Sequence, residues 1–325
     1  MTAGGPSVGP GRFRGTALAI RDPLPWDRAV QVVRTSEETG YAAVFVPEAR
    51  GREAFSTLAG FAAATTRVLL GTGVVAIRRR TPETTAMATA TVQESSGGRL
   101  ILGIGSGSPS GGPGASAGSP AETIDQVRAY VERVKEAFAE LELDVPHRPP
   151  IWLAALGDRM LALAGAIADG VIMNWCTPDR VATARRILDE AGEGAGREPG
   201  TVTVSVYVRA SLGLEEAVAV EGLREMTGRY AAVPHYRRQM EAMGLGEEAN
   251  AASRAFRSRR SGDVPEALVR ALTVMGGREG WLERQSSYRS AGADLVVCYP
   301  VPVLDTFSSI LGTALAAAPS TAVER

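Results

Sequence analysis

Short apolar runs alternate with longer segments of helical spacing along most of the chain. The apolar runs are rich in β-branched residues, and they predict eight strands, at residues 16–20, 43–47, 68–75, 100–105, 151–154, 170–173, 202–208 and 295–299. Strands that alternate with helices are typical of a parallel sheet covered by those helices. Eight such units favour a closed (β/α)8 TIM barrel of the α/β class over an open, doubly wound sheet.

Three of the predicted helices begin at a hydroxyl residue followed by proline, at positions 81, 119 and 177. A Thr or Ser hydroxyl can accept a hydrogen bond from the first helical turn, and proline fits the first helical position. These pairs predict where the three helices start.

Two segments interrupt the alternation. Residues 106–119 are almost wholly Gly, Ser, Pro and Ala, which predicts a loop after the fourth strand that is either a lid or a disordered segment. Residues 214–276 are predicted to form a helical insertion between strands seven and eight that caps one side of the barrel mouth. Tyr230, Tyr236 and Met240 lie in this insertion, and their spacing predicts core positions.

Composition narrows the kind of ligand. The chain has 325 residues, of which 45% are hydrophobic, and Lys and Arg (35) nearly balance Asp and Glu (36). This balance gives no reason to expect a nucleic-acid partner, and no apolar stretch has the length of a membrane span, so we expect a small-molecule ligand and a cytoplasmic protein. Residues 1–12 are expected to be a flexible tail and residues 13–325 a single domain.

Cysteine and histidine are scarce. Cys176 and Cys298 lie far apart, each at the end of an apolar run, so we expect buried, reduced thiols and no metal site. His147 lies in a proline-rich connector and is expected at the surface, whereas His235 in the insertion is a weak candidate for a proton donor.

Several runs resemble the luciferase-like monooxygenase superfamily. They are GYAAVFVPE at 40–48, TRVLLGTGVV at 66–75, SGGRLILGIGSG at 96–107 and ADGVIMN at 168–174, which occur in the family's order and spacing. The run AALGDRML at 154–161 resembles the phosphate-binding turn of the branch that uses the deazaflavin coenzyme F420. The run GREAF at 51–55 resembles an actinobacterial subgroup of that branch, and GADLVV at 292–297 resembles the last strand.

This resemblance implies the fold, the cofactor and a set of contact residues. It implies a luciferase-like barrel that binds F420, or FMN as the alternative, with a cis peptide bond between Gly73 and Val74 behind the ring. The cofactor-binding residues it implies are Glu48, Gly73, Val74, Gly105, Ser106, Gly107, Leu156, Gly157, Arg159, Met160 and Asn174.

Simpler interpretations of the same residues stay open. Gly73 can serve close strand packing alone, and Glu48 can form a salt bridge with a neighbour such as Arg50. The turn that contains Gly157 can be an ordinary strand-to-helix connection, and Asn174 can be polar surface. A phosphate would satisfy the free N–H groups where that turn enters its helix.

Two arginine clusters flank the predicted mouth, at residues 78–80 and at Arg257, Arg259 and Arg260. Charge runs are usually solvated, but a basic rim would suit the anionic tail of F420.

The chain departs from one template of the F420 branch. Ala49 and Ser108 occupy the positions where the sugar-phosphate dehydrogenases of that branch carry His and Glu. Their acid–base apparatus is therefore absent, and the catalytic residues are left unassigned.

We expect an oxidoreductase that transfers a hydride between F420 and an unknown small organic molecule. The alternatives are an FMN-dependent two-component monooxygenase served by a flavin reductase, and a catalytically silent flavin-binding barrel. The resemblance also makes a homodimer possible.

Overall fold

The computed structural model describes residues 13–20, 24–49, 51–107, 120–143, 145, 147–303 and 305–319. The expected tail at residues 1–12 and most of the expected loop, residues 108–119, lie outside this part of the chain.

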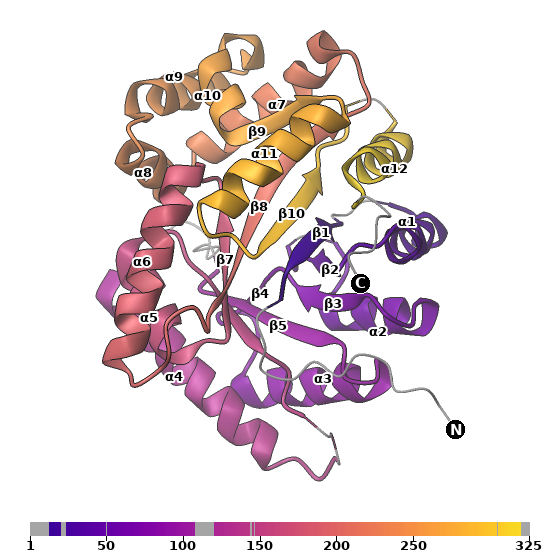
Figure 1. Cartoon of the computed structure of the whole chain (residues 1–325), viewed down its shortest axis with the longest axis vertical. Helices are drawn as coiled ribbons and strands as arrows, with labels where there is room; N and C mark the ends of the chain where they lie inside the picture. The colour runs from indigo at the N-terminus through magenta and orange to yellow at the C-terminus, as the bar shows by residue number, and fades with distance from the viewer. Residues whose placement is uncertain are drawn as a thin grey trace.

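Eight parallel strands form a closed barrel, which confirms the predicted fold (Figure 1). Neighbouring strands follow the chain order, and the last barrel strand, β10, pairs with both β1 and β8, so the sheet has no open edge in the barrel. The barrel strands are β1 (Gly15–Ala19), β2 (Ala43–Val46), β3 (Leu69–Thr72), β5 (Leu100–Gly105), β6 (Ile151–Ala154), β7 (Gly170–Asn174), β8 (Thr203–Leu212) and β10 (Leu295–Pro300).

Helices cover the outside of the barrel (Figure 1). They are α1 (Trp26–Glu38), α2 (Ala54–Ala64), α3 (Pro82–Ser95), α4 (Pro120–Ala139), α5 (Asp158–Ile167), α6 (Pro178–Gly194), α11 (Arg278–Ser290) and α12 (Thr306–Ala317). Two predicted starts are confirmed, because the hydroxyls of Thr81 and Thr177 accept hydrogen bonds from the N–H groups of Thr84 and Arg180. Helix α4 begins at Pro120 as expected, while Ser119 lies outside the described residues.

The third predicted strand is not continuous. Residues 68–75 were expected as one strand, but β3 ends at Thr72 and a separate two-residue strand, β4 (Val75–Ala76), follows. The peptide bond between Gly73 and Val74 is cis, as the resemblance implied, and it lies between these two strands.

The insertion between β8 and β10 is mainly helical but ends in a strand. It contains α7 (Glu216–Ala231), α8 (Pro234–Ala242), α9 (Gly246–Arg257), a short 3-10 helix (Ser261–Asp263) and α10 (Glu266–Leu272). The expectation of a wholly helical insertion was wrong at its end, where β9 (Thr273–Gly276) pairs with the last four residues of β8. Strand β8 runs to Leu212, beyond the predicted end at residue 208, so it offers a free edge to which four residues can add.

Two layers of side chains fill the molecule. Between strands and helices lies a large aliphatic core, and inside the barrel lies a smaller cluster dominated by Phe45, Trp152, Tyr207 and Tyr299. Rings in this inner cluster are 5.6–6.1 Å apart, within the range of favourable aromatic contacts. The aromatic side chains fill the barrel, so a ligand has to bind at its mouth.

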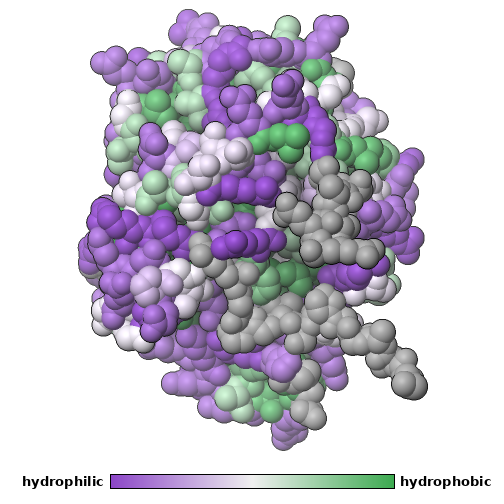
Figure 2. Space-filling view, in the orientation of Figure 1, coloured by the Kyte–Doolittle hydropathy of each residue, from purple (hydrophilic) through white to green (hydrophobic). Residues whose placement is uncertain are grey.

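The insertion has a core of its own. Met240 is fully buried there, with Tyr230 and Tyr236 half-buried against the cluster, which confirms the core positions predicted for them. On the face of the whole molecule shown in Figure 2, apolar side chains appear in small groups between hydrophilic ones. Among the described helices, none is long and apolar enough to cross a membrane.

Candidate functional site

The predicted cofactor-binding residues lie at the carboxyl ends of the barrel strands. Glu48 follows β2, Gly73 and Val74 follow β3, and Gly105 ends β5. Ser106 and Gly107 come directly after Gly105. Leu156, Gly157, Arg159 and Met160 lie in and after the turn that joins β6 to α5, and Asn174 ends β7. In a parallel barrel these ends meet at one mouth, which is where such folds carry their active sites.

Four of these residues meet at the cis peptide bond. The N–H of Gly73 donates to the carbonyl of Val46 (2.8 Å), and the N–H of Glu48 donates to the carbonyl of Val74 (3.3 Å). A Cβ atom on Gly105 would lie only 2.7 Å from Cγ2 of Val74. Glycine at positions 73 and 105 therefore leaves a closely packed backbone wall at the mouth.

Tyr207 of β8 faces this wall from inside the barrel. Its side chain fills the space beside Gly73, and a Cβ atom added there would overlap the hydroxyl oxygen. That oxygen is buried and has no hydrogen-bond partner among the described residues. Burial also raises the pKa of Tyr207 well above its usual value, so the hydroxyl stays protonated. Tyr207 therefore realises the close-packing interpretation of Gly73, and it leaves a buried hydroxyl that no described residue satisfies.

Glu48 is held in an ion pair. Its two carboxylate oxygens accept hydrogen bonds from Nε and an Nη of Arg80, at 3.0 and 2.8 Å, and the same guanidinium also contacts the carboxylate of Glu53. The salt-bridge interpretation of Glu48 is therefore realised, with Arg80 as the partner. Arg50, the partner suggested from the sequence, lies outside the described residues. The hydrogen bonds that Arg80 donates to Glu48 outweigh the opposing effect of burial and raise the pKa of Arg80.

In the first arginine cluster, two of the three side chains have protein partners, while Arg78 is exposed. Arg80 is neutralised by its two carboxylates, and Arg79 donates to the carbonyl of Ala49. Of the second cluster, Arg257 donates to the carbonyl of Ala232 and Arg260 pairs with Asp263 at 3.2 Å.

The turn between β6 and α5 is open and uncapped. Gly157 is the N-cap residue of α5, and it has no side chain that could accept a hydrogen bond from the first helical turn. A Cβ atom added to Gly157 would meet nothing within 4 Å. Arg159 is exposed in the first helical turn. Arg180 of α6 fixes the turn from behind, because it donates to the carbonyl of Leu156 and pairs with Asp158, both at 2.7 Å. An uncapped helix start with a nearby arginine can accept a phosphate.

Asn174 is not a free polar group at the mouth. Its Oδ1 accepts a hydrogen bond from Arg209 (2.9 Å), and its Nδ2 donates to the hydroxyl of Tyr236 (3.1 Å). The insertion thus bonds directly to the end of β7. The backbone carbonyls of Asn174 and Trp175 also accept hydrogen bonds from Gln239 of α8.

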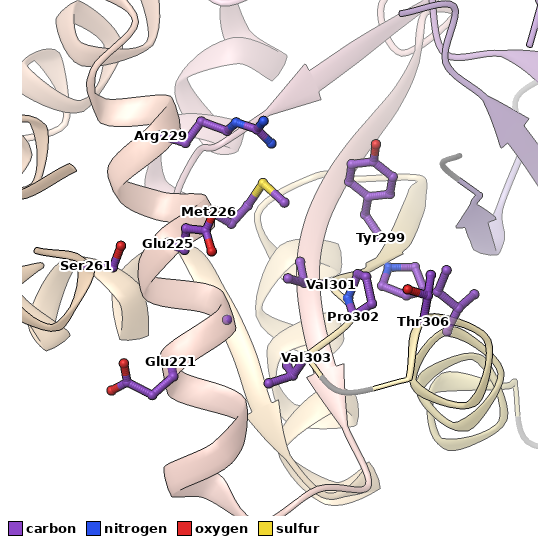
Figure 3. A pocket seen from close by; sticks show the side chains of 13 residues that line it. Glu221, Glu225, Met226, Arg229, Ser261, Tyr299, Val301, Pro302, Val303 and Thr306 are labelled. Carbon is purple, nitrogen blue, oxygen red and sulfur yellow. The ribbon is translucent and has the colours of Figure 1, made fainter. Parts of the chain in front are cut away.

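A cavity of about 550 Å³ lies between α7, the end of β10 and the start of α12. Met226 and Arg229 project from α7 toward Tyr299 and Val301 of the opposite wall (Figure 3). Pro300, Pro302, Val303 and Ile310 make much of the rest of the lining apolar. Since Tyr299 also belongs to the inner barrel cluster, the cavity adjoins the barrel mouth.

The burial of the cysteine and histidine side chains indicates which of them could take part in the site. Cys176 and Cys298 are buried free thiols and His147 is exposed, as predicted. His235 is half-buried against the ring of Tyr236, and burial, with Arg238 nearby, lowers its pKa. Among the described residues no group of three His, Cys, Asp or Glu side chains could hold a metal ion. Ser108, at the position of the missing acid, lies outside the described part of the chain.

The sequence interpretation missed Tyr207 and Arg209. Residues 203, 205, 207, 209 and 211 of β8 are Thr, Ser, Tyr, Arg and Ser, whereas the residues between them are Val, Val, Val and Ala. The aliphatic positions pack in the outer core, so the polar positions point into the barrel. This two-residue alternation was visible in the sequence and could have identified both residues.

Comparison with known proteins agrees with this geometry. Residues 10–295 match the family model described as luciferase-like monooxygenase. A Mycobacterium tuberculosis protein named for coenzyme F420-dependent oxidoreductase activity is 27% identical, over 87% of this chain and 93% of its own. The 5,10-methylenetetrahydromethanopterin reductase of Methanolobus tindarius is 29% identical over 60% of this chain and 66% of its own.

One solved structure with a similar fold is that of the coenzyme F420-dependent tetrahydromethanopterin reductase of Methanopyrus kandleri. It superimposes with a TM-score of 0.75 at 20% identity, covering 94% of this chain and 98% of the reductase. At this identity the likeness bears on the fold alone.

Proposed function

This chain belongs to the luciferase-like monooxygenase family, and from that membership we propose that it is an F420-dependent oxidoreductase that transfers a hydride between the deazaflavin ring and a small organic molecule. The name of the Mycobacterium tuberculosis relative supports F420 over FMN. The observation that carries the proposal is that the closely packed backbone at Gly73 and Gly105 lies at the same mouth as the uncapped helix start at Gly157. The wall suits a flat ring, and the helix start suits a phosphate.

Residues of β2 to β5 would hold the ring. Gly73, Val74 and Gly105 present backbone at close packing distance, and Ser106 and Gly107 follow with further polar groups. Glu48 is held in place by Arg80, so it would act as a fixed acceptor. When bound, F420 supplies the hydride-carrying ring, and the protein contributes position and electrostatics.

The turn after β6 would hold the phosphate. The N–H groups at the start of α5 and the side chain of Arg159 are the donors, while Leu156 and Met160 flank them. Arg180 keeps the turn in place through its bonds to Leu156 and Asp158.

The 550 Å³ cavity beside Tyr299 would hold the substrate. Its volume is within the usual range for small-molecule sites, and its lining combines apolar side chains with Arg229 and the carboxylates of Glu221 and Glu225, which suits a molecule with both apolar and polar parts. The substrate itself is unassigned.

A titration of the purified protein with F420 and with FMN tests the cofactor. We expect micromolar affinity for F420 and no measurable affinity for FMN. The reverse result would replace the proposal with the FMN-dependent monooxygenase, for which a flavin reductase would be the partner. Binding of neither cofactor would overturn both.

Arg159→Gln tests the phosphate turn. We expect a loss of F420 affinity of about tenfold, because one charge-assisted hydrogen bond is removed. Arg186→Gln is the matched control, since Arg186 is exposed on α6 and pairs only with Glu190 among the described residues. Equal affinities of the two variants would exclude Arg159 from the site.

A further inference from the structure

Arg209 is a buried cation at the barrel mouth. The residue is 2% exposed, and its guanidinium lies 3.8 Å from the ring centroid of Tyr299, with Trp175 and Tyr230 at 5.2 and 5.3 Å. The aromatic faces stabilise the positive charge but take no hydrogen bonds from its edge. None of the ion pairs among the described residues involves Arg209.

A second buried arginine shows what a purely structural one looks like in this chain. Arg99 is 4% exposed, and its guanidinium donates five hydrogen bonds, to Ser96, Thr65, Val68 and Ala62. Arg209 instead donates two, to Oδ1 of Asn174 and to the hydroxyl of Tyr230. Its Nε is buried and has no partner among the described residues. A guanidinium carries five N–H groups, so Arg209 keeps N–H groups that have no partner among the described residues.

The fold places Arg209 across the barrel from the predicted cofactor wall. Strands β3 and β8 are four strands apart in either direction around the barrel, so they form opposite walls. Tyr207 and Arg209 are two residues apart on β8 and point to the same side. Tyr207 reaches Gly73 across the barrel, and Arg209 lies one layer nearer the mouth. Tyr207 fills the space beside Gly73, so a substrate bound on the mouth side of Tyr207 would lie next to Arg209.

We propose that Arg209 binds a carboxylate group of the substrate and so selects small, aromatic or apolar carboxylic acids. A carboxylate matches the planar fork of a guanidinium and supplies the negative charge that the described residues do not. The rings of Trp175, Tyr230 and Tyr299 surround the site with apolar surface for the body of the molecule. This proposal rests on the proposed function only in that F420 would supply the hydride to the bound acid, and binding of the carboxylate does not depend on it.

Benzoate and benzamide are matched probes, because they differ in charge and not in shape. By calorimetry at pH 7 we expect the wild-type protein to bind benzoate at least about tenfold more tightly than benzamide, as expected for a charge-assisted hydrogen bond. Arg209→Gln should abolish this preference, whereas the exposed control Arg186→Gln should retain it. Equal binding of the two probes to the wild-type protein would overturn the proposal.

Crystals of the wild-type protein soaked in 4-bromobenzoate give a test that does not depend on the variant's folding. We expect the carboxylate on the guanidinium of Arg209, with the bromine signal at the opposite end of the ring. A carboxylate bound elsewhere, for instance on Arg229 in the 550 Å³ cavity, would overturn the assignment.

F420 titration of Arg209→Gln separates substrate from cofactor. We expect the affinity for F420 to stay within about threefold of the wild-type value, because Arg209 is assigned to the substrate. A tenfold loss would show that the arginine serves the cofactor and would overturn the proposal. If the wild-type protein binds benzoate at Arg209 but no F420, the proposed function fails and the carboxylate site stands.

Discussion

The hydroxyl group of Tyr207 on β8 lies against the backbone of Gly73 on the opposite wall of the barrel. A Cβ atom at position 73 would overlap that hydroxyl and would lie 3.2 Å from the Cβ of Phe45. The side chain of Tyr207 thus fills the barrel up to the cis peptide bond, and only glycine leaves room for it.

Gly73→Ala should therefore be destabilising. We expect the free energy of unfolding to fall by about 1–3 kcal/mol, the usual cost of overpacking a core, and F420 affinity to fall with it. Removing the hydroxyl in Gly73→Ala/Tyr207→Phe should restore part of both. Urea unfolding and F420 titration measure these effects.

Gly194→Ala is the control for that series, because a Cβ atom there meets nothing within 4 Å. If Gly73→Ala were as stable as Gly194→Ala, the close approach of Tyr207 would be refuted.

The barrel fold could be predicted from the sequence because the pattern of an apolar run followed by a helical segment is repeated along the chain. Eight apolar runs separated by helical segments point to one topology, even though several boundaries are displaced by a few residues. Strand β9 could not be predicted in the same way. It has four residues, and it is a strand only because the end of β8 offers it a partner.

Contacts within the site were harder to predict than positions. Glu48 could be placed at a strand end, but its partner Arg80 is 32 residues away and becomes a neighbour only through the packing of β2 against β3. Likewise, Asn174 was expected as a free polar group, and its bonds to Arg209 and Tyr236 depend on how the insertion folds over the mouth. Such long-range pairs leave no periodic pattern in the sequence.

Arg80→Met should destabilise the protein more than an ordinary surface substitution. The side chains of Arg80 and Glu48 are only 14% and 13% exposed, so removal of the cation leaves two carboxylates close together without their partner. We expect a loss of roughly 2 kcal/mol, less than the 3–5 kcal/mol of a fully buried pair. Urea unfolding measures it, with the exposed Arg78→Met as the control. A loss equal to that of the control would mean that the pair contributes nothing to stability.

Both cysteines should be unreactive in the folded protein. Burial raises the pKa of the Cys176 thiol to about 12 and raises that of Cys298 as well, and the thiolate is the reactive form. With a disulfide reagent at pH 8, we expect no labelling of the native protein and two labelled thiols in urea. Rapid labelling without denaturant would contradict the burial of these residues.

Glu37 should make stability depend on pH in the acidic range. Burial alone would raise its pKa. The backbone N–H groups of Val68, Arg67 and Thr66 donate to the carboxylate and together lower the pKa by more than burial raises it, so the net pKa is below 4.5. A carboxyl group with a lowered folded-state pKa stabilises the protein above its unfolded pKa, and this contribution is lost as the pH falls through the folded value. We therefore expect Glu37→Gln to lower the free energy of unfolding by about 1–2 kcal/mol at pH 7, with the deficit shrinking as the pH drops below 4.5. Urea unfolding between pH 7 and 3 measures this difference, with the exposed Glu38→Gln as the control. A deficit that stays constant with pH would mean that the charge of Glu37 is not what holds the start of the third strand.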